Sequence, residues 1–191
     1  MSEWIEATTL AGGHVTLRPL RAEDATALGE VVDDPEPFRL SAVPIGTEAA
    51  QSYIDAAFDN PFRVAYAVID NSTGDLVGST SFYDIDPGNR SVAIGYTFYA
   101  ASRHGSKVNP EAKLLLLRYA FEVAGAVRVV WHTDERNARS RSAIAKLGAT
   151  FEGLLRKHRP ATDGGWRTTA QYSMIDEDWP GAKEKLVARI S

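Results

Sequence analysis

The stretch 109–148 constrains the fold of this chain more than any other part of the sequence. Its first segment predicts a helix, because Asn109 is a favoured N-cap residue, Pro110 suits the first helical position, and small or apolar residues recur at a helical period up to a closing glycine. An apolar strand is expected over 127–131, and Asn137 then caps a second short helix that a glycine ends. A loop that leads into a helix N-terminus beside a strand holds anions on backbone amides.

The remainder of the chain predicts antiparallel strands interrupted by helices. Strand patterns bounded by turn residues lie at 14–19, 63–70, 76–84, 90–99, 150–158 and 167–175, and helical patterns lie at 22–32, 48–58 and 177–189. Residues 1–13 are expected to form a loosely held lead-in. Hairpins interrupted by packed helices indicate an α+β or mixed-sheet α/β fold, and 191 residues without repeats or linkers predict a single domain over 1–191.

Composition excludes several classes of protein. A net charge of −4 argues against generic nucleic-acid binding, and the lack of cysteine excludes a disulfide framework, a thiol nucleophile and a thiolate metal site. No apolar run approaches the ~18 residues of a membrane span, and the N-terminus lacks a signal-peptide pattern, so a cytoplasmic protein is expected. No metal is expected, because no two of the four histidines have metal-ligand spacing: His14, His104, His132 and His158.

The loop before the central helix is a candidate site for a pyrophosphate. Consecutive amides at a helix N-terminus offer hydrogen-bond donors and a partial positive charge, and Arg103, His104 and Lys107 add formal charge. Taken alone, such a loop is more often a solvated connection.

Five short motifs together resemble the GCN5-related N-acetyltransferase (GNAT) superfamily. They are Val-Asn-Pro-Glu-Ala-Lys-Leu-Leu-Leu at 108–116, the Asn137-x-x-Ser140 pair, Lys-Leu-Gly-Ala at 146–149, Phe-Glu-Gly-Leu-Leu-Arg at 151–156 and Ala-Ile-Gly-Tyr at 93–96. Within the superfamily the sequence is most similar to the ribosomal-protein N-terminal acetyltransferase (RimJ/RimL-like) branch. Each motif alone is weak, but their order and spacing are specific, and the resemblance extends over roughly 15–179.

The resemblance implies a twisted, mostly antiparallel mixed sheet that splays at its centre, is flanked by helices and binds acetyl-CoA in the opening. The cofactor contacts that it implies are Phe98, Tyr99, Ala100, Arg103, His104, Gly105, Ser106, Lys107, Val108, Asn109, Asn137 and Ser140. The main chain at 96–100 is expected to bind pantetheine and to polarise the thioester carbonyl. Lys107 departs from the family pattern, because the loop of the family has glycine there.

Asn137 and Ser140 have both a structural and a functional interpretation. Asn137 is an N-cap, and Ser140 is expected to lie on the apolar face of the helix, where its hydroxyl needs a partner. In the resembling branch the asparagine contacts pantetheine and the serine lies near the thiol. Many other relatives carry tyrosine where this chain has Ile144, so Ser140 is the predicted general acid that protonates the leaving thiolate.

Ala93 bears on the acceptor, because relatives often carry a glutamate base at this position. An α-amine has a pKa of about 7.7–8.0 and a lysine side chain a pKa of about 10.4, so a lysine costs roughly 3–4 kcal/mol more to deprotonate. The absence of a strong base favours an α-amine or another weakly basic acceptor, and we expect direct acetyl transfer to a protein or peptide N-terminal α-amine. His132, Glu135 and His158 remain candidate proton relays.

Two other functions stay open at this point. An acid-rich pocket would favour a small amine such as a polyamine, amino acid or aminoglycoside, and the acids available for it are Asp33, Asp34, Glu36, Asp84 and Asp86. The two departures, Lys107 and Ala93, are also compatible with a non-catalytic CoA-binding module. The expected partner is an amine acceptor rather than nucleic acid or a membrane, and the protein is expected to be a monomer or a homodimer.

Overall fold

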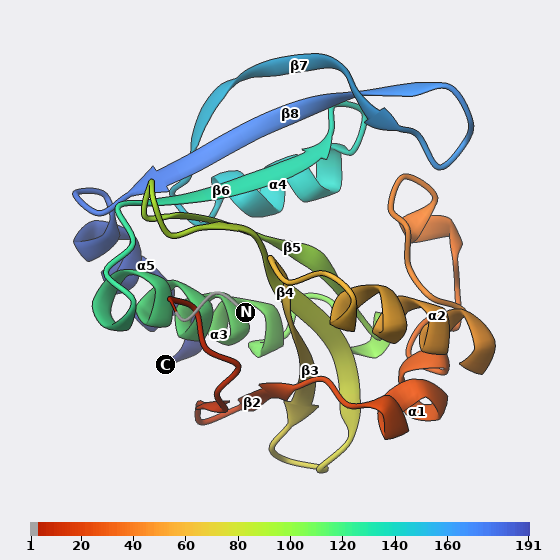
Figure 1. Ribbon diagram of the computed structural model, residues 1–191. Coiled ribbons are helices and arrows are strands. Elements are labelled where there is room, and N and C mark those ends of the chain that lie inside the picture. Colours follow the sequence, from red (N-terminus) through yellow and green to blue (C-terminus); the bar gives the residue numbers. More distant parts are fainter. Residues whose placement is uncertain (1–3) are drawn as a thin grey trace.

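The computed structural model describes residues 4–191 and contains one eight-stranded sheet with the strand order β1-β2-β3-β4-β5-β6-β8-β7 (Figure 1). All neighbouring strands are antiparallel except β5 and β6. The strands are β1 (Leu10–Ala11), β2 (Val15–Pro19), β3 (Val64–Asp70), β4 (Leu76–Asp86), β5 (Ser91–Tyr99), β6 (Arg128–Asp134), β7 (Thr150–Pro160) and β8 (Trp166–Ile175).

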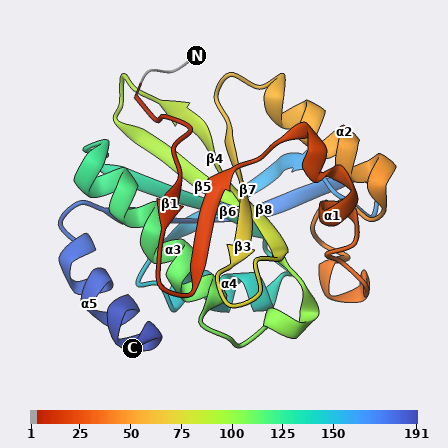
Figure 2. The same ribbon diagram turned by 90° about the horizontal axis from the view of Figure 1, so that it is seen from below.

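The helices cover both faces of this sheet (Figure 2). They are α1 (Ala25–Gly29), α2 (Thr47–Phe58), α3 (Val108–Arg118), α4 (Ala138–Ala145) and α5 (Trp179–Ile190). Side chains of β3 alternate between two cores, since Ala67 packs with α1 and α2, whereas Val68 packs with α3, α4 and α5. None of the helices in 4–191 is both long and apolar enough to span a membrane.

The predicted fold class is confirmed, and each predicted strand is present within a few residues of its expected bounds. The predicted helix 22–32 is shorter than expected: a 3₁₀ turn at Ala22–Asp24 is followed by α1, which ends at Gly29. A Cβ atom at Gly29 would lie 2.4 Å from the carbonyl carbon of Gly46. Only glycine fits in this close approach. The Gly29 carbonyl accepts from the Gly46 amide at 2.9 Å rather than from a further turn of helix, so α1 ends there.

The prediction of a loosely held lead-in is wrong for residues 4–13, and residues 1–3 lie outside the described part of the chain. The indole of Trp4 donates to the Ala124 carbonyl at 2.7 Å, and Ile5 is buried. Buried Glu111 accepts hydrogen bonds from the amides of Gly13, His14 and Val15 at 3.0, 2.6 and 2.7 Å. This carboxylate therefore anchors the turn between β1 and β2 to the start of α3, a role that its place in the first helical turn did not reveal.

The central helix differs from its prediction at both ends. It begins at Val108 with Lys107 as N-cap, so Asn109 is the second helical residue rather than the cap. After Arg118 the chain continues as a π-helical turn at Tyr119–Val123, in which the Ala124 amide donates to the Tyr119 carbonyl at 2.9 Å. Gly125 then adopts a φ of 66°, as expected for a glycine that ends a helix.

Candidate active site

β5 and β6 separate in the middle of the sheet (Figure 1). They pair at Ser91–Arg128, Val92–Val129 and Ala93–Val130 and no further. Beyond this point β5 continues along β4, and β6 continues along β8. The inner edges of residues 94–99 and 131–134 therefore have no strand partner. We call this region the opening, and it corresponds to the splay that the resemblance implies.

A β-bulge in β5 borders the opening. Ser79 of β4 pairs with Phe98 and Ser81 pairs with Gly95, so Tyr96 and Thr97 together lie opposite Thr80. Tyr96 has a φ of 50°, an uncommon value for a residue with a side chain. Such bulges re-aim side chains, and here Tyr96 packs toward α2 whereas Thr97 contacts α3. The bulge thus presents different chemistry to the two faces of the sheet.

On the α2 face, Tyr83 crosses from β4 over Gly95 to β6. A Cβ atom at Gly95 would lie 2.6 Å from the Tyr83 ring, so a larger residue would displace this ring. The Tyr83 hydroxyl lies 3.0 Å from Nδ1 of His132, and the Tyr96 ring meets the Tyr83 ring edge-on at 5.2 Å. The pair Tyr83–His132 therefore spans β5 and β6 close to where they separate.

The neighbours of His132 determine its tautomer. Glu152 only accepts hydrogen bonds, so the Gln171 amide nitrogen, 3.0 Å from the carboxylate, faces it, and the Gln171 oxygen faces Nε2 of His132 at 3.1 Å. Nε2 therefore carries the proton, and Nδ1 accepts from the Tyr83 hydroxyl. Arg128 lowers the pKa of Glu152 to about 2, while burial lowers the pKa of His132. At neutral pH His132 is an uncharged imidazole whose Nδ1 lone pair faces the Tyr83 hydroxyl.

The loop before α3 offers backbone donors. The amides of Gly105 and Lys107 have no backbone or side-chain acceptor among residues 4–191, and Gly105 adopts a φ of 76°. The Ser106 hydroxyl accepts from the Val108 amide at 3.3 Å. Two free amides at the start of a helix can bind an anion by their hydrogens and by the macrodipole.

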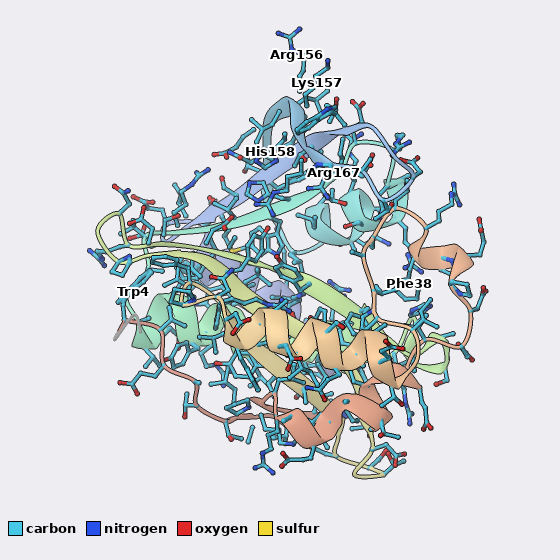
Figure 3. All side chains as sticks on the ribbon, turned by 45° about the vertical axis from the view of Figure 1, so that its right-hand side comes forward. Trp4, Phe38, Arg156, Lys157, His158 and Arg167 are labelled. Carbon is cyan, nitrogen blue, oxygen red and sulfur yellow. The ribbon has the colours of Figure 1, made fainter. Side chains whose placement is uncertain are left out.

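The cationic side chains of this loop are engaged by the protein itself. Arg103 pairs with Asp70 at 3.1 Å, and the Lys107 ammonium donates to the Ser191 carbonyl at 2.7 Å. His104 is exposed, and its ring lies 6.1 Å from that of Phe38, which also lies under Arg139 of α4 at 5.1 Å. Phe38, labelled in Figure 3, therefore lies between the α3 loop and the start of α4, so these two segments border the same region.

Three predicted contacts at the end of β5 can act only through the main chain. The side chains of Phe98 and Tyr99 are buried in the two opposite cores. The Ala100 amide already donates to the Val77 carbonyl at 2.9 Å, so it is not a free donor for an oxyanion. Any main-chain amide that polarises the thioester carbonyl must therefore belong to a residue nearer the bulge.

At α4 the structure confirms the local prediction. Asn137 caps the helix, with its side-chain oxygen accepting from the Ser140 amide at 3.0 Å. Ser140 is half-buried, and its hydroxyl has no hydrogen-bond partner among residues 4–191. Ile144 is buried in the core, so no side-chain hydroxyl replaces that of Ser140 one turn later.

Lys113 is a buried cation that the sequence analysis did not single out. Its ammonium donates to Thr97 at 2.7 Å and to Thr80 at 3.1 Å, and the residue is 5% exposed. Burial lowers its pKa to about 7, so about half of the molecules carry an uncharged amine there at neutral pH. The side chain braces the β5 bulge from the α3 face. A charged residue within the otherwise apolar run 112–117 was the available sequence signal.

Replacing Lys113 with methionine is expected to change how stability depends on pH. In the unfolded chain Lys113 titrates near pH 10.5, so between about pH 7 and 10.5 the unfolded state binds more protons. The wild type should gain stability relative to the variant as pH rises above 7, by up to about 1.4 kcal/mol per pH unit. Urea unfolding at pH 6, 7, 8 and 9 measures this, with the exposed Lys185→Met as control. A pH-independent difference would mean that Lys113 keeps its ordinary pKa.

Tyr83 and Arg63 were also missed by the sequence analysis. Both belong to apolar strand patterns and carry no local motif. Arg63 lies against the Tyr96 ring on the same face of the sheet as Tyr83. Of the relays named from sequence, the structure connects His132 to this cluster directly, whereas the ring of His158 lies 5.3 Å from that of His132.

Comparison with known proteins agrees with this geometry. Residues 14–150 match the family described as the acetyltransferase (GNAT) domain. The chain therefore belongs to the GNAT family and is an acetyltransferase.

Three relatives illustrate the match. A crystal structure from T. thermophilus, described as an acetyltransferase, is 36% identical with a TM-score of 0.88, over 98% of this chain and 100% of the other. The uncharacterized N-acetyltransferase p20 of Bacillus licheniformis is 25% identical over 91% of this chain and 99% of its own. RimJ of Mycobacterium smegmatis in complex with CoA-disulfide shares the fold, with 24% identity and a TM-score of 0.78 over 94% of this chain and 90% of its own.

Proposed function

We propose that this protein transfers the acetyl group of acetyl-CoA directly to a primary amine, the α-amine of a protein or peptide N-terminus. The amine nitrogen bonds to the acetyl carbon, the bond from that carbon to sulfur breaks, and CoA leaves as a thiolate. The observation that carries the proposal is the opening itself. Free amides precede α3 beyond the end of β5. The neutral imidazole of His132 on β6 is hydrogen-bonded to Tyr83 of β4 across β5, close to where β5 and β6 separate.

The residues of the α3 loop fit the diphosphate of CoA. The amides of Gly105 and Lys107 are free to donate, and a Cβ at Gly105 would meet nothing within 4 Å, so a phosphate has room to approach the main chain. His104, Ser106, Val108 and Asn109 complete the proposed loop contact. Arg103 and Lys107 would contribute charge to phosphate only by leaving Asp70 and Ser191. Asn137 is proposed to contact the pantetheine arm beside Phe98 and Tyr99.

Tyr83 and His132 are proposed to remove the proton of the incoming ammonium. As the ammonium proton passes to the Tyr83 oxygen, the Tyr83 proton passes to Nδ1 of His132, and the imidazole becomes a cation. The Gln171 oxygen, held by Glu152, keeps the other ring nitrogen protonated throughout. On the departing side, Ser140 is proposed to give its hydroxyl proton to the CoA thiolate and to regain one from solvent. The acetylated nitrogen releases its second proton to solvent, and the His132 cation releases its proton to solvent before the next turnover.

This relay suits a weakly basic amine. Burial lowers the pKa of His132, so the imidazole accepts a proton only weakly. An α-ammonium has a pKa of about 7.7–8.0, whereas a lysine ammonium has a pKa of about 10.4 and would transfer its proton to this relay roughly 10²–10³ times less readily. Ala93 leaves the glutamate position of relatives without a stronger base. These features together support an α-amine acceptor over a lysine side chain.

A pocket for a polyamine finds less support. Asp84 pairs with Arg159 at 3.2 Å, and Asp86 accepts from the Asn89 side chain at 2.7 Å within its own turn. Asp33 and Asp34 are exposed, and Glu36 pairs with Arg39 at 2.9 Å. The acids that could attract several ammonium groups are therefore dispersed or neutralised.

The acceptor proposal is tested by CoA release at pH 7 from acetyl-CoA with two matched peptides. One has a free N-terminus and no lysine, and the other is N-terminally acetylated with one lysine. We expect the α-amine peptide to react faster, because more of it is neutral and its proton leaves more readily. Faster acetylation of the blocked lysine peptide would contradict the proposal.

Binding of the co-substrate is measured separately by thermal unfolding. CoA should raise the melting temperature, because a ligand that binds only the folded state stabilises it, whereas NAD at the same concentration should have little effect. No shift with millimolar CoA would contradict acetyl-CoA use by this chain.

A further inference from the structure

Arg63, which immediately precedes β3, is a buried cation without an anionic partner. It is 8% exposed, and its Nε donates to the Ser81 hydroxyl at 3.2 Å. Its guanidinium carbon lies 3.7 Å from the centre of the Tyr96 ring and 4.5 Å from that of Tyr53. Nη2 has no hydrogen-bond partner, and no carboxylate of residues 4–191 pairs with the group.

An isolated buried charge is costly, and three other cations of this chain, Arg18, Arg103 and Lys113, avoid that cost. Arg18 pairs with Asp24 at 2.6 Å, and Arg103 pairs with Asp70 at 3.1 Å. Lys113 loses its proton near neutral pH, but a guanidinium cannot be deprotonated in a protein. Two aromatic faces compensate Arg63 only in part, since ring faces attract a cation less strongly than a carboxylate does. Nη1 also has no hydrogen-bond partner among residues 4–191, and unlike Nη2 it is not fully buried, so it is the donor that an anion from outside the chain can reach.

The location of Arg63 indicates which molecule brings that anion. Its guanidinium lies on Tyr96, the bulge residue beside the opening, and the Tyr96 ring in turn meets Tyr83, the first member of the proposed proton relay. All three lie on the α2 face, whereas the free amides proposed for the CoA diphosphate precede α3, beyond the end of β5. An anion at Arg63 would therefore belong to the amine substrate rather than to CoA.

The charges around this face agree. Arg159 is joined to Asp84, whereas half-buried Arg167 donates from Nε to the Thr169 hydroxyl and pairs with no carboxylate of residues 4–191. Figure 3 shows Arg167 and His158 on the β7–β8 hairpin at the top of the view, with Arg156 and Lys157 projecting away from the molecule. The side chains near the relay thus attract an acidic group and repel a second ammonium.

Building on the proposed acetyl transfer, we propose that Arg63 binds a carboxylate of the acceptor, so the preferred substrate is a primary amine with a carboxylate close by. Two sources share this chemistry. One is an acidic side chain at the start of a peptide, and the other is the α-carboxylate of a free amino acid.

Matched acid and amide substrates test this proposal and separate the two sources. The first pair is a peptide amide that begins with glutamate and the same peptide that begins with glutamine, and the second pair is free alanine and alaninamide. In the pair whose acid resembles the natural acceptor, we expect kcat/KM to be about 10- to 100-fold higher for the acid than for the amide. This is the effect of losing one charged hydrogen bond. This wild-type comparison requires no folded variant.

Arg63→Met should reduce that acid-to-amide ratio to about one, and Arg63→Lys should restore part of it. Arg118→Met removes an exposed charge on α3 and should leave the ratio at its wild-type value. A wild-type enzyme that prefers neither acid, or a ratio that survives in Arg63→Met, overturns the carboxylate site. If the amines of the amide substrates are then still acetylated and CoA still raises the melting temperature, the acetyl-transfer proposal stands. Failure to acetylate any amine would overturn both.

Discussion

Tyr83→Phe is expected to lower kcat by about 10²–10⁴-fold, the usual effect of losing a proton-transfer group. The substitution removes only the hydroxyl that lies 3.0 Å from Nδ1 of His132, and it keeps the ring that packs over Gly95. The ammonium proton then has no path to the imidazole. Steady-state rates of CoA release with an α-amine peptide measure the loss, and the KM for acetyl-CoA should change little.

A double variant distinguishes a relay from two independent contributions. If Tyr83 and His132 pass one proton in sequence, Tyr83→Phe combined with His132→Phe should be no slower than the worse single variant. Tyr66→Phe is the matched control, because it removes another buried phenol hydroxyl, which contacts the Glu6 carbonyl at 3.4 Å in the core on the α3 side of the sheet. If the losses in kcat multiply in the double variant, Tyr83 and His132 contribute independently and form no relay. If kcat of Tyr83→Phe is unchanged, Tyr83 is only a packing residue.

Ser140→Ala is expected to lower kcat by a similar factor, about 10²–10⁴-fold, with little change in acetyl-CoA binding. Protonation of the thiolate matters only as the bond to sulfur breaks, so the lost interaction belongs to the transition state. The substitution should leave α4 intact, because the cap is the bond from the Ser140 backbone amide to the Asn137 side chain, which alanine preserves.

Ser142→Ala provides the control for this second prediction. Ser142 is exposed on the same helix, so its replacement alters helix composition equally but removes no group near the opening. Unchanged melting temperatures for both variants, with loss of kcat only in Ser140→Ala, would support the general-acid role. If kcat of Ser140→Ala equals that of the wild type, Ser140 is only a residue of the first helical turn.

Features of this chain that depend on consecutive residues were predictable from the sequence, whereas features that depend on distant contacts were not. The turn at Gly125, the cap at Asn137 and the strand positions were predictable, because each depends on a few consecutive residues through backbone angle, capping or side-chain period. The start of α3 was misplaced by two residues, because the Ser106 hydroxyl already serves the Val108 amide and lets the helix begin before Asn109.

The site depends on contacts between residues far apart in the chain, which no local pattern encodes. Tyr83 meets His132 only because β4, β5 and β6 lie side by side in one register, and a shift by one residue would turn Tyr83 to the other face. The extra residue at the Tyr96 bulge likewise decides that Arg63 meets Tyr96 while Lys113 meets Thr97. The sequence by itself determined the elements and the family to which the chain belongs. The tertiary structure alone decided which ionisable groups were buried together, because burial and strand register are properties of the whole sheet.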